Sequence, residues 1–190
     1  MKGFKPIYGA WSGLLGALAF ALLWSWAVVA DGSWQFGVDT LSELGRIGGG
    51  GRDIFNFGVI LASLLWLPFA LGLMKMLPSS WLSRIGGSLF LVSAAFLFAI
   101  GIFPIDSGTP HTVASWAFFI TALLSLLMLA TPLYRMEGLG VIPMIASITA
   151  PMLSMAFLAF TSVPLAEAIA VICLMIWAVI VSSHIILLRR

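Results

Sequence analysis

The sequence predicts an all-α integral membrane protein, with a single domain over residues 1–190 that contains six transmembrane helices. Mean hydropathy is +1.14, 62% of the residues are hydrophobic and only 8% are charged. A soluble domain of this length could not bury so much apolar surface. The chain also divides into six apolar runs, each of about the 20 residues that a bilayer core requires.

The continuity of these runs predicts helices. Only helices or closed barrels satisfy the backbone in lipid, and barrel strands are about half as long and alternate apolar with polar residues. An even number of spans places both termini on one side of the membrane. The expected spans are 8–30, 54–74, 85–105, 112–133, 139–160 and 168–188.

The first run, 8–30, is longer than the apolar core of a signal peptide, so we interpret it as a retained helix. It carries Gly9, Gly13, Ala17 and Ala21 at four-residue spacing. Small residues at this spacing let another helix approach closely. The ridge predicts packing within the chain, and a dimer contact would have the same pattern.

The connection 31–53 is the longest and predicts a short outer amphipathic helix between the first two spans. Thr40 and Glu43, three residues apart, fit a capping box. The glycines 48–51 would end this helix and act as a flexible hinge, because no P-loop Lys-Ser/Thr pair follows them. Polar and apolar side chains fall on different helical faces. The polar face holds Asp39, Ser42, Glu43 and Arg46, and the apolar face holds Leu41, Leu44 and Ile47.

Polar residues open the second run, 54–74. Arg52 and Asn56 lie one helical turn apart on the same face. An amide in a membrane helix should face the bundle, because an unpaired amide is costly in lipid. For Asn56 we favour an interhelical hydrogen bond over a contact with a ligand.

The turn between the third and fourth runs, 85–105 and 112–133, brings Asp106 close to His111. A carboxylate–imidazole pair could orient a general base or bind a metal. The alternative, which the spacing favours, is a hydrogen-bonded staple between two helices. The other histidine, His184, is expected at the opposite end of the bundle, which excludes a bis-histidine haem within this chain.

The last two runs, 139–160 and 168–188, complete the bundle. Pro143 and Pro151 predict a kink in the fifth span. The sixth span carries the single cysteine, Cys173, so neither an internal disulfide nor a cysteine-based metal site is possible. We interpret Cys173 as a small buried hydrophobe.

Charged residues separate onto the two sides of the membrane. Because Lys and Arg in short loops stay in the cytoplasm, the pattern predicts a multi-pass protein of the cell membrane with cytoplasmic N- and C-termini. Basic residues scattered at helix ends do not indicate nucleic-acid binding. Asp31 and Glu167 are interpreted as solvated carboxylates. The inner residues are Lys2, Lys5, Lys75, Arg84, Arg135, Glu137, Arg189 and Arg190, and the outer ones Asp31, Asp39, Glu43, Arg46, Arg52, Asp53, Asp106 and Glu167.

A candidate site lies at the outer end, where the long connection meets the Asp106–His111 turn. We expect neither a metal nor a cofactor. One histidine among carboxylates is a poor tetrahedral zinc set and would suit a hard cation or a weak surface site better. Motifs such as Gly-x-Ser-x-Gly and His-Glu-x-x-His are absent from the sequence. The catalytic candidates are Asp106, His111 and Glu43, and the ligand-binding candidates are Arg52, Asn56, Ser42 and Asp39.

Three segments together resemble a multi-span membrane family, the domain of unknown function 998 (DUF998). They are Leu41–Gly45, Arg52–Gly58, and Gly101–Asp106 followed by His111. The resemblance covers most of the chain and implies a six-helix bundle with polar motifs gathered at one end. By analogy, the defining positions would be Ser42, Glu43, Arg52, Asn56, Asp106 and His111. The family name implies no reaction.

These observations favour a non-enzymatic protein that binds a lipid or small apolar ligand near its outer face, or scaffolds a membrane partner. The alternative is a hydrolase or transferase acting on lipid headgroups at the outer leaflet. Asp106–His111 would act as acid and base, Glu43 or Asp39 would hold a metal, and Arg52 would bind a phosphate. Transport is less favoured, because few polar residues lie at mid-membrane. The expected partners are membrane lipids and either a second copy or another membrane protein, but no nucleic acid.

Overall fold

The computed structural model describes residues 4–189, and in that part of the chain the fold is all-helical, as predicted. Six α-helices are each long and apolar enough to cross a membrane. Two short 3-10 helices, η1 (Leu41–Gly45) and η2 (Ile105–Ser107), lie in the connections. The long helices are α1 (Pro6–Asp31), α2 (Arg52–Met76), α3 (Trp81–Ile102), α4 (Thr109–Tyr134), α5 (Ile142–Phe160) and α6 (Val163–Leu188).

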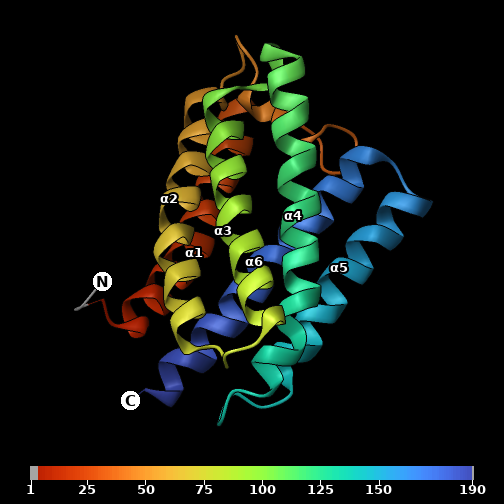
Figure 1. The fold of residues 1–190 in the computed structure, drawn as a ribbon. Coiled ribbons are helices and arrows are strands. Elements are labelled where there is room, and N and C mark those ends of the chain that lie inside the picture. Colours follow the sequence, from red (N-terminus) through yellow and green to blue (C-terminus); the bar gives the residue numbers. More distant parts are fainter. Residues whose placement is uncertain (1–3, 190) are drawn as a thin grey trace.

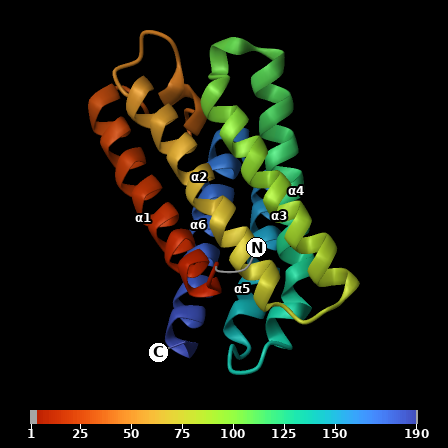
Figure 2. The same cartoon turned by 60° about the vertical axis from the view of Figure 1, so that its left-hand side comes forward.

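The six long helices form a ring in chain order, in which α6 returns to pack against α1 (Figures 1 and 2). The start of α1 and the end of α6 lie at one end of this bundle (Figure 1). Residues 32–51, which we call the cap, cover the other end, which we call the cap end.

The small-residue ridge of α1 packs inside the ring. A Cβ added at Gly9 would lie 2.6 Å from the carbonyl oxygen of Pro68 on α2, and one at Gly13 would lie 2.6 Å from the Ser182 hydroxyl oxygen on α6. Only glycine allows backbones to approach this closely. The ridge therefore serves the packing that we predicted within the chain.

Aromatic side chains fill the middle of the ring. Trp66, Phe69, Phe90 and Trp177 are buried, and their neighbouring ring centroids lie 5.2–5.9 Å apart. The Trp177 indole N–H also donates to the Ser147 hydroxyl at 2.7 Å, which ties α6 to α5. The core is thus dense in the middle of the ring. At the cap end, by contrast, the bundle is hollow.

The cap contains η1, a single short 3-10 helix. The predicted capping box is present: the Thr40 side chain accepts from the Glu43 backbone N–H, and the Glu43 carboxylate accepts from the Thr40 backbone N–H at 2.5 Å. The Thr40 hydroxyl also donates to the Glu43 carboxylate at 3.1 Å. The predicted amphipathic character is not confirmed. Ser42 of the expected polar face is buried together with Leu41 and Leu44, because η1 is pressed onto the bundle.

The glycines 48–51 have a different role from the flexible hinge that we expected. A Cβ on Gly50 would clash with the Ala30 carbonyl oxygen at the end of α1, and a Cβ on Gly51 would lie 2.5 Å from the Ala27 carbonyl oxygen. Side chains would force the cap away from α1 at these points. Gly50 and Gly51 therefore permit close approach of two backbones, whereas Gly48 adopts a positive φ of 84° with open space around it.

Candidate functional site

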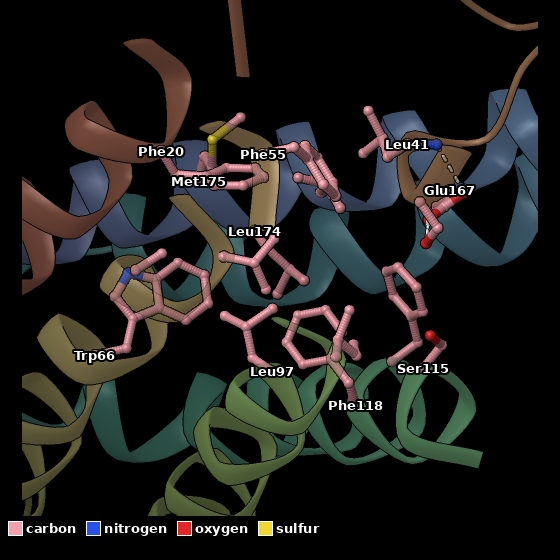
Figure 3. Close-up of a pocket in the computed structure, with 16 residues that line it drawn as sticks. Phe20, Leu41, Phe55, Trp66, Leu97, Ser115, Phe118, Glu167, Leu174 and Met175 are labelled. Carbon is pink, nitrogen blue, oxygen red and sulfur yellow. Dashed lines mark hydrogen bonds between the residues drawn. The ribbon is translucent and has the colours of Figure 1, made fainter. Parts of the chain in front are cut away.

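Two adjoining cavities lie beneath the cap. The larger, which we call the lateral cavity, has a volume of about 300 Å³ and is lined by the cap, η2, α4, α5 and α6. The smaller, the central cavity, has about 50 Å³ and lies inside the helix ring. Figure 3 shows Glu167 and Ser115 at one end of the central cavity and Trp66 at the other. The two cavities share the wall residues Ser42, Ser115, Phe119 and Glu167.

The lateral cavity is mostly apolar and opens sideways. Helices α4 and α5 diverge toward the cap end (Figure 1). Trp116 of α4 and Leu158 of α5 both line the cavity and are 53% and 46% exposed. Deeper in, Leu123 and Ser154 line it from the same two helices. The opening therefore lies on a face of the bundle that would meet lipid.

Glu167 on α6 is the only carboxylate in the described part of the chain that lines either of these cavities. Its carboxylate accepts from the Leu41 backbone N–H at 3.1 Å, drawn in Figure 3, and from the Ser42 hydroxyl at 3.1 Å. Our expectation of a solvated carboxylate was wrong for this residue. Glu167 closes the cavities at the cap end and holds η1 in place.

The position of Glu167 follows from where α6 begins. The helix starts at Val163 and not at residue 168, so Glu167 lies within its second turn. The Ser162 hydroxyl caps this start by accepting from the Leu165 N–H at 3.4 Å, and Pro164 occupies the first turn. A serine followed two residues later by a proline is a helix-start signal that could have located this residue from the sequence.

His111 is buried and belongs to the lateral cavity wall. Its Nδ1 lies 2.7 Å from the Phe103 carbonyl oxygen. A carbonyl can only accept, so Nδ1 carries a proton, and in the tautomer protonated at Nδ1 the Nε2 atom is an acceptor. The Ser115 hydroxyl, one turn along α4, lies 3.3 Å from Nε2 and donates to it. Ser115 was not among the predicted residues, although its spacing of four from His111 places both on one helical face.

Asp106 and His111 do not form a carboxylate–imidazole hydrogen bond, since each side chain bonds elsewhere. Asp106 accepts from the Ile47 backbone N–H at 2.6 Å and so ties the turn before α4 to the cap. Asn56 donates to the Gly45 carbonyl oxygen at 3.1 Å. The hydrogen bond that we favoured for Asn56 is present, but its partner is η1 and not another long helix.

The other predicted residues lie outside both cavities. Glu43 bonds to Thr40, as described, and Asp39 accepts from the Gln35 backbone N–H at 2.7 Å. Arg52 is half-buried, and its Nε has no hydrogen-bond partner within residues 4–189. Of the predicted site residues, only Ser42 and His111 line the lateral cavity.

Asp31 also differs from the solvated carboxylate that we expected. Its side chain is 3% exposed and lies 4.0 Å from Arg46. It accepts from the backbone N–H groups of Ser33 and Trp34 at 3.3 and 3.1 Å. This carboxylate therefore fixes the turn that leads from α1 into the cap.

Carboxylates and histidines do not cluster within the described residues 4–189. No group there of three or more His, Cys, Asp or Glu side chains could hold a metal ion.

Comparison with known proteins gives a family and no characterised relative. A family model described as "Protein of unknown function (DUF998)" matches residues 14–184, which is most of the chain. No curated protein and no solved structure matches the sequence.

Proposed function

We propose that this chain, which belongs to the DUF998 family, binds a lipid-like amphiphile in the lateral cavity. One observation carries the proposal: an apolar cavity of about 300 Å³ opens between α4 and α5 and ends in a small polar group at the cap. Ligand sites typically combine apolar walls with a few placed polar groups at about this volume or above. The polar group consists of Ser42, His111, Ser115 and Glu167.

The arrangement of this polar group favours binding over catalysis. The Ser115 hydroxyl on His111 Nε2 resembles a nucleophile and its base. In serine hydrolases, a carboxylate behind the imidazole stabilises the cation that forms. Here the neutral Phe103 carbonyl occupies that place, and the Asp106 carboxylate is bound to the Ile47 N–H instead. Arg52, which we considered for a phosphate, does not line the cavity.

Blocking the cavity tests the proposal. Ala170 is buried on α6 and lines the lateral cavity, so Ala170→Phe places a ring where the ligand would lie. Ala156 on the exposed face of α5 gives the matched control, Ala156→Phe. We expect native mass spectrometry to show a lipid-sized adduct on the wild type and on Ala156→Phe. The adduct on Ala170→Phe should fall about tenfold, equivalent to ~1.4 kcal/mol. An adduct equally abundant on both variants would contradict the proposal, as would a wild type without one.

The orientation of the bundle is part of the same proposal. The end opposite the cap carries Lys5, Lys75, Arg84, Arg135 and Arg189, with Glu137 as the one acidic residue among the described residues there. The positive-inside rule therefore supports a cytoplasmic location for that end and an external location for the cap in the cell membrane.

Cysteine accessibility tests this orientation. Val38 in the cap is 65% exposed and Glu137 is exposed at the other end. In a Cys173→Ala background, we expect an impermeant maleimide to label Val38→Cys on intact cells and Glu137→Cys only after lysis. The reverse pattern would show that the cap faces the cytoplasm.

A further inference from the structure

The hydroxyl and imidazole donors on the polar wall of the lateral cavity already form hydrogen bonds within the protein. The hydroxyl of Ser42 donates to Glu167, that of Ser115 to His111, and the His111 Nδ1–H to the Phe103 carbonyl. The other hydroxyls on this wall also donate within the protein. Thr40 donates to Glu43, Thr112 to the Gly108 carbonyl and Ser154 to the Ala150 carbonyl.

Lone pairs, by contrast, remain available at the cap end of the cavity. The Glu167 carboxylate accepts from Leu41 and Ser42 and does not fill the roughly four acceptor positions that a carboxylate has. The hydroxyl oxygens of Ser42 and Ser115 are donors in their protein contacts and can each still accept. The indole N–H of Trp116, on the half-exposed rim, is the remaining side-chain donor on this wall. The inner end of the site is thus rich in acceptors.

The site is also negatively charged, and this charge favours the same kind of ligand as its acceptors do. Among the described residues, 4–189, no Lys or Arg lines the lateral cavity. Within residues 4–189, Glu167 forms no ion pair, and Arg46 pairs instead with Asp31. A carboxylate without a cationic partner is costly away from water, and an intramembrane ionisable residue usually marks a functional site with a partner. An anionic headgroup here would add like-charge repulsion to that cost.

The headgroup, and not the tail, must select the ligand. A hydrocarbon chain gains little by leaving lipid for an apolar cavity, because lipid tails are as apolar as the cavity wall. Hydrogen bonds to a charged group are among the stronger ones, and an unpaired polar group in an apolar site is penalised. Glu167 and its neighbours therefore determine which ligand headgroups bind.

We infer that the ligand of the lateral cavity is a long-chain amphiphile whose headgroup donates hydrogen bonds, an amine above all and a hydroxyl next, and not a phosphate or a carboxylate. This inference rests on the proposed function. The headgroup lies against the Glu167 carboxylate and the Ser42 and Ser115 oxygens. The aliphatic chain runs along Phe119 toward Ser154, with its exit between α4 and α5.

A competition among amphiphiles of one chain length tests the headgroup. The purified protein in neutral micelles is incubated with equal concentrations of dodecylamine, monolauroylglycerol and dodecyl phosphate, and native mass spectrometry measures each adduct. We expect the amine adduct to exceed the phosphate adduct by about tenfold or more, with the glycerol ester between them. A phosphate adduct as abundant as the amine adduct would overturn the headgroup inference and leave the proposed function standing. Absence of all three adducts would overturn both.

Two glutamine variants test whether Glu167 is the source of the preference for an amine headgroup. Glu167→Gln removes the charge but keeps a carbonyl that can accept from Leu41, so the cap should hold and the variant should fold. We expect its amine adduct to fall about tenfold while the glycerol ester adduct changes little. Glu137→Gln, exposed at the opposite end, is the control and should match the wild type. An amine adduct that survives in Glu167→Gln would show that the amine binds elsewhere.

Discussion

Replacing Trp177 with alanine is expected to lower the free energy of unfolding by about 3–5 kcal/mol. Trp177 is fully buried in the middle of the ring, with ring centroids 5.9 Å from Phe69 and 5.2 Å from Phe90. The substitution opens a void where α2, α3, α5 and α6 meet and removes the hydrogen bond to Ser147. Denaturant titration of the purified protein in micelles measures the change.

Trp26 provides the matched control for this prediction. It is 62% exposed on α1, so Trp26→Ala removes the same side chain from the surface of the bundle. We expect a change within about 0.5 kcal/mol. Equal destabilisation by the two substitutions would mean that the aromatic cluster does not organise the ring.

Replacing Glu167 with alanine is expected to loosen the cap. The substitution leaves the Leu41 N–H and the Ser42 hydroxyl without their acceptors, and an unsatisfied buried group costs about 1–3 kcal/mol. If that cost appears as easier local opening, amide exchange in residues 40–45 should accelerate by about 5- to 150-fold. Hydrogen–deuterium exchange mass spectrometry measures this directly.

Glu167→Gln separates the hydrogen bonds of the cap from the charge of the site. Its side-chain carbonyl can still accept from Leu41, so exchange in residues 40–45 should stay close to that of the wild type. If exchange in Glu167→Ala is as slow as in the wild type, the cap is held by its other contacts, those of Asn56 and Asp106, and Glu167 has no structural role.

The fold could be predicted from the sequence because lipid imposes simple requirements. An apolar run of about 20 residues has few alternatives to a membrane helix. The capping box of Thr40 and Glu43 and the small-residue ridge of α1 depend on local spacing, and both are present. Predictions succeeded where neighbours along the chain decide the structure.

The candidate site was harder to predict because its partners are distant in the sequence. Asp106 bonds to the Ile47 backbone N–H and Asn56 to the Gly45 carbonyl, and side-chain patterns do not reveal backbone partners. Hydropathy placed the start of the last span at residue 168, which left Glu167 in a loop. The true start at Val163 turns Glu167 toward Leu41, which lies 126 positions away along the chain.

An experimental density map of the wild-type protein, extracted into nanodiscs together with its native membrane lipids, would test the central claim most directly, which is that the lateral cavity holds an amphiphile. We predict elongated density that begins beside Glu167 and Ser115 and leaves the bundle between α4 and α5. A map in which the side chains of α4, α5 and α6 meet and close this space would contradict the claim.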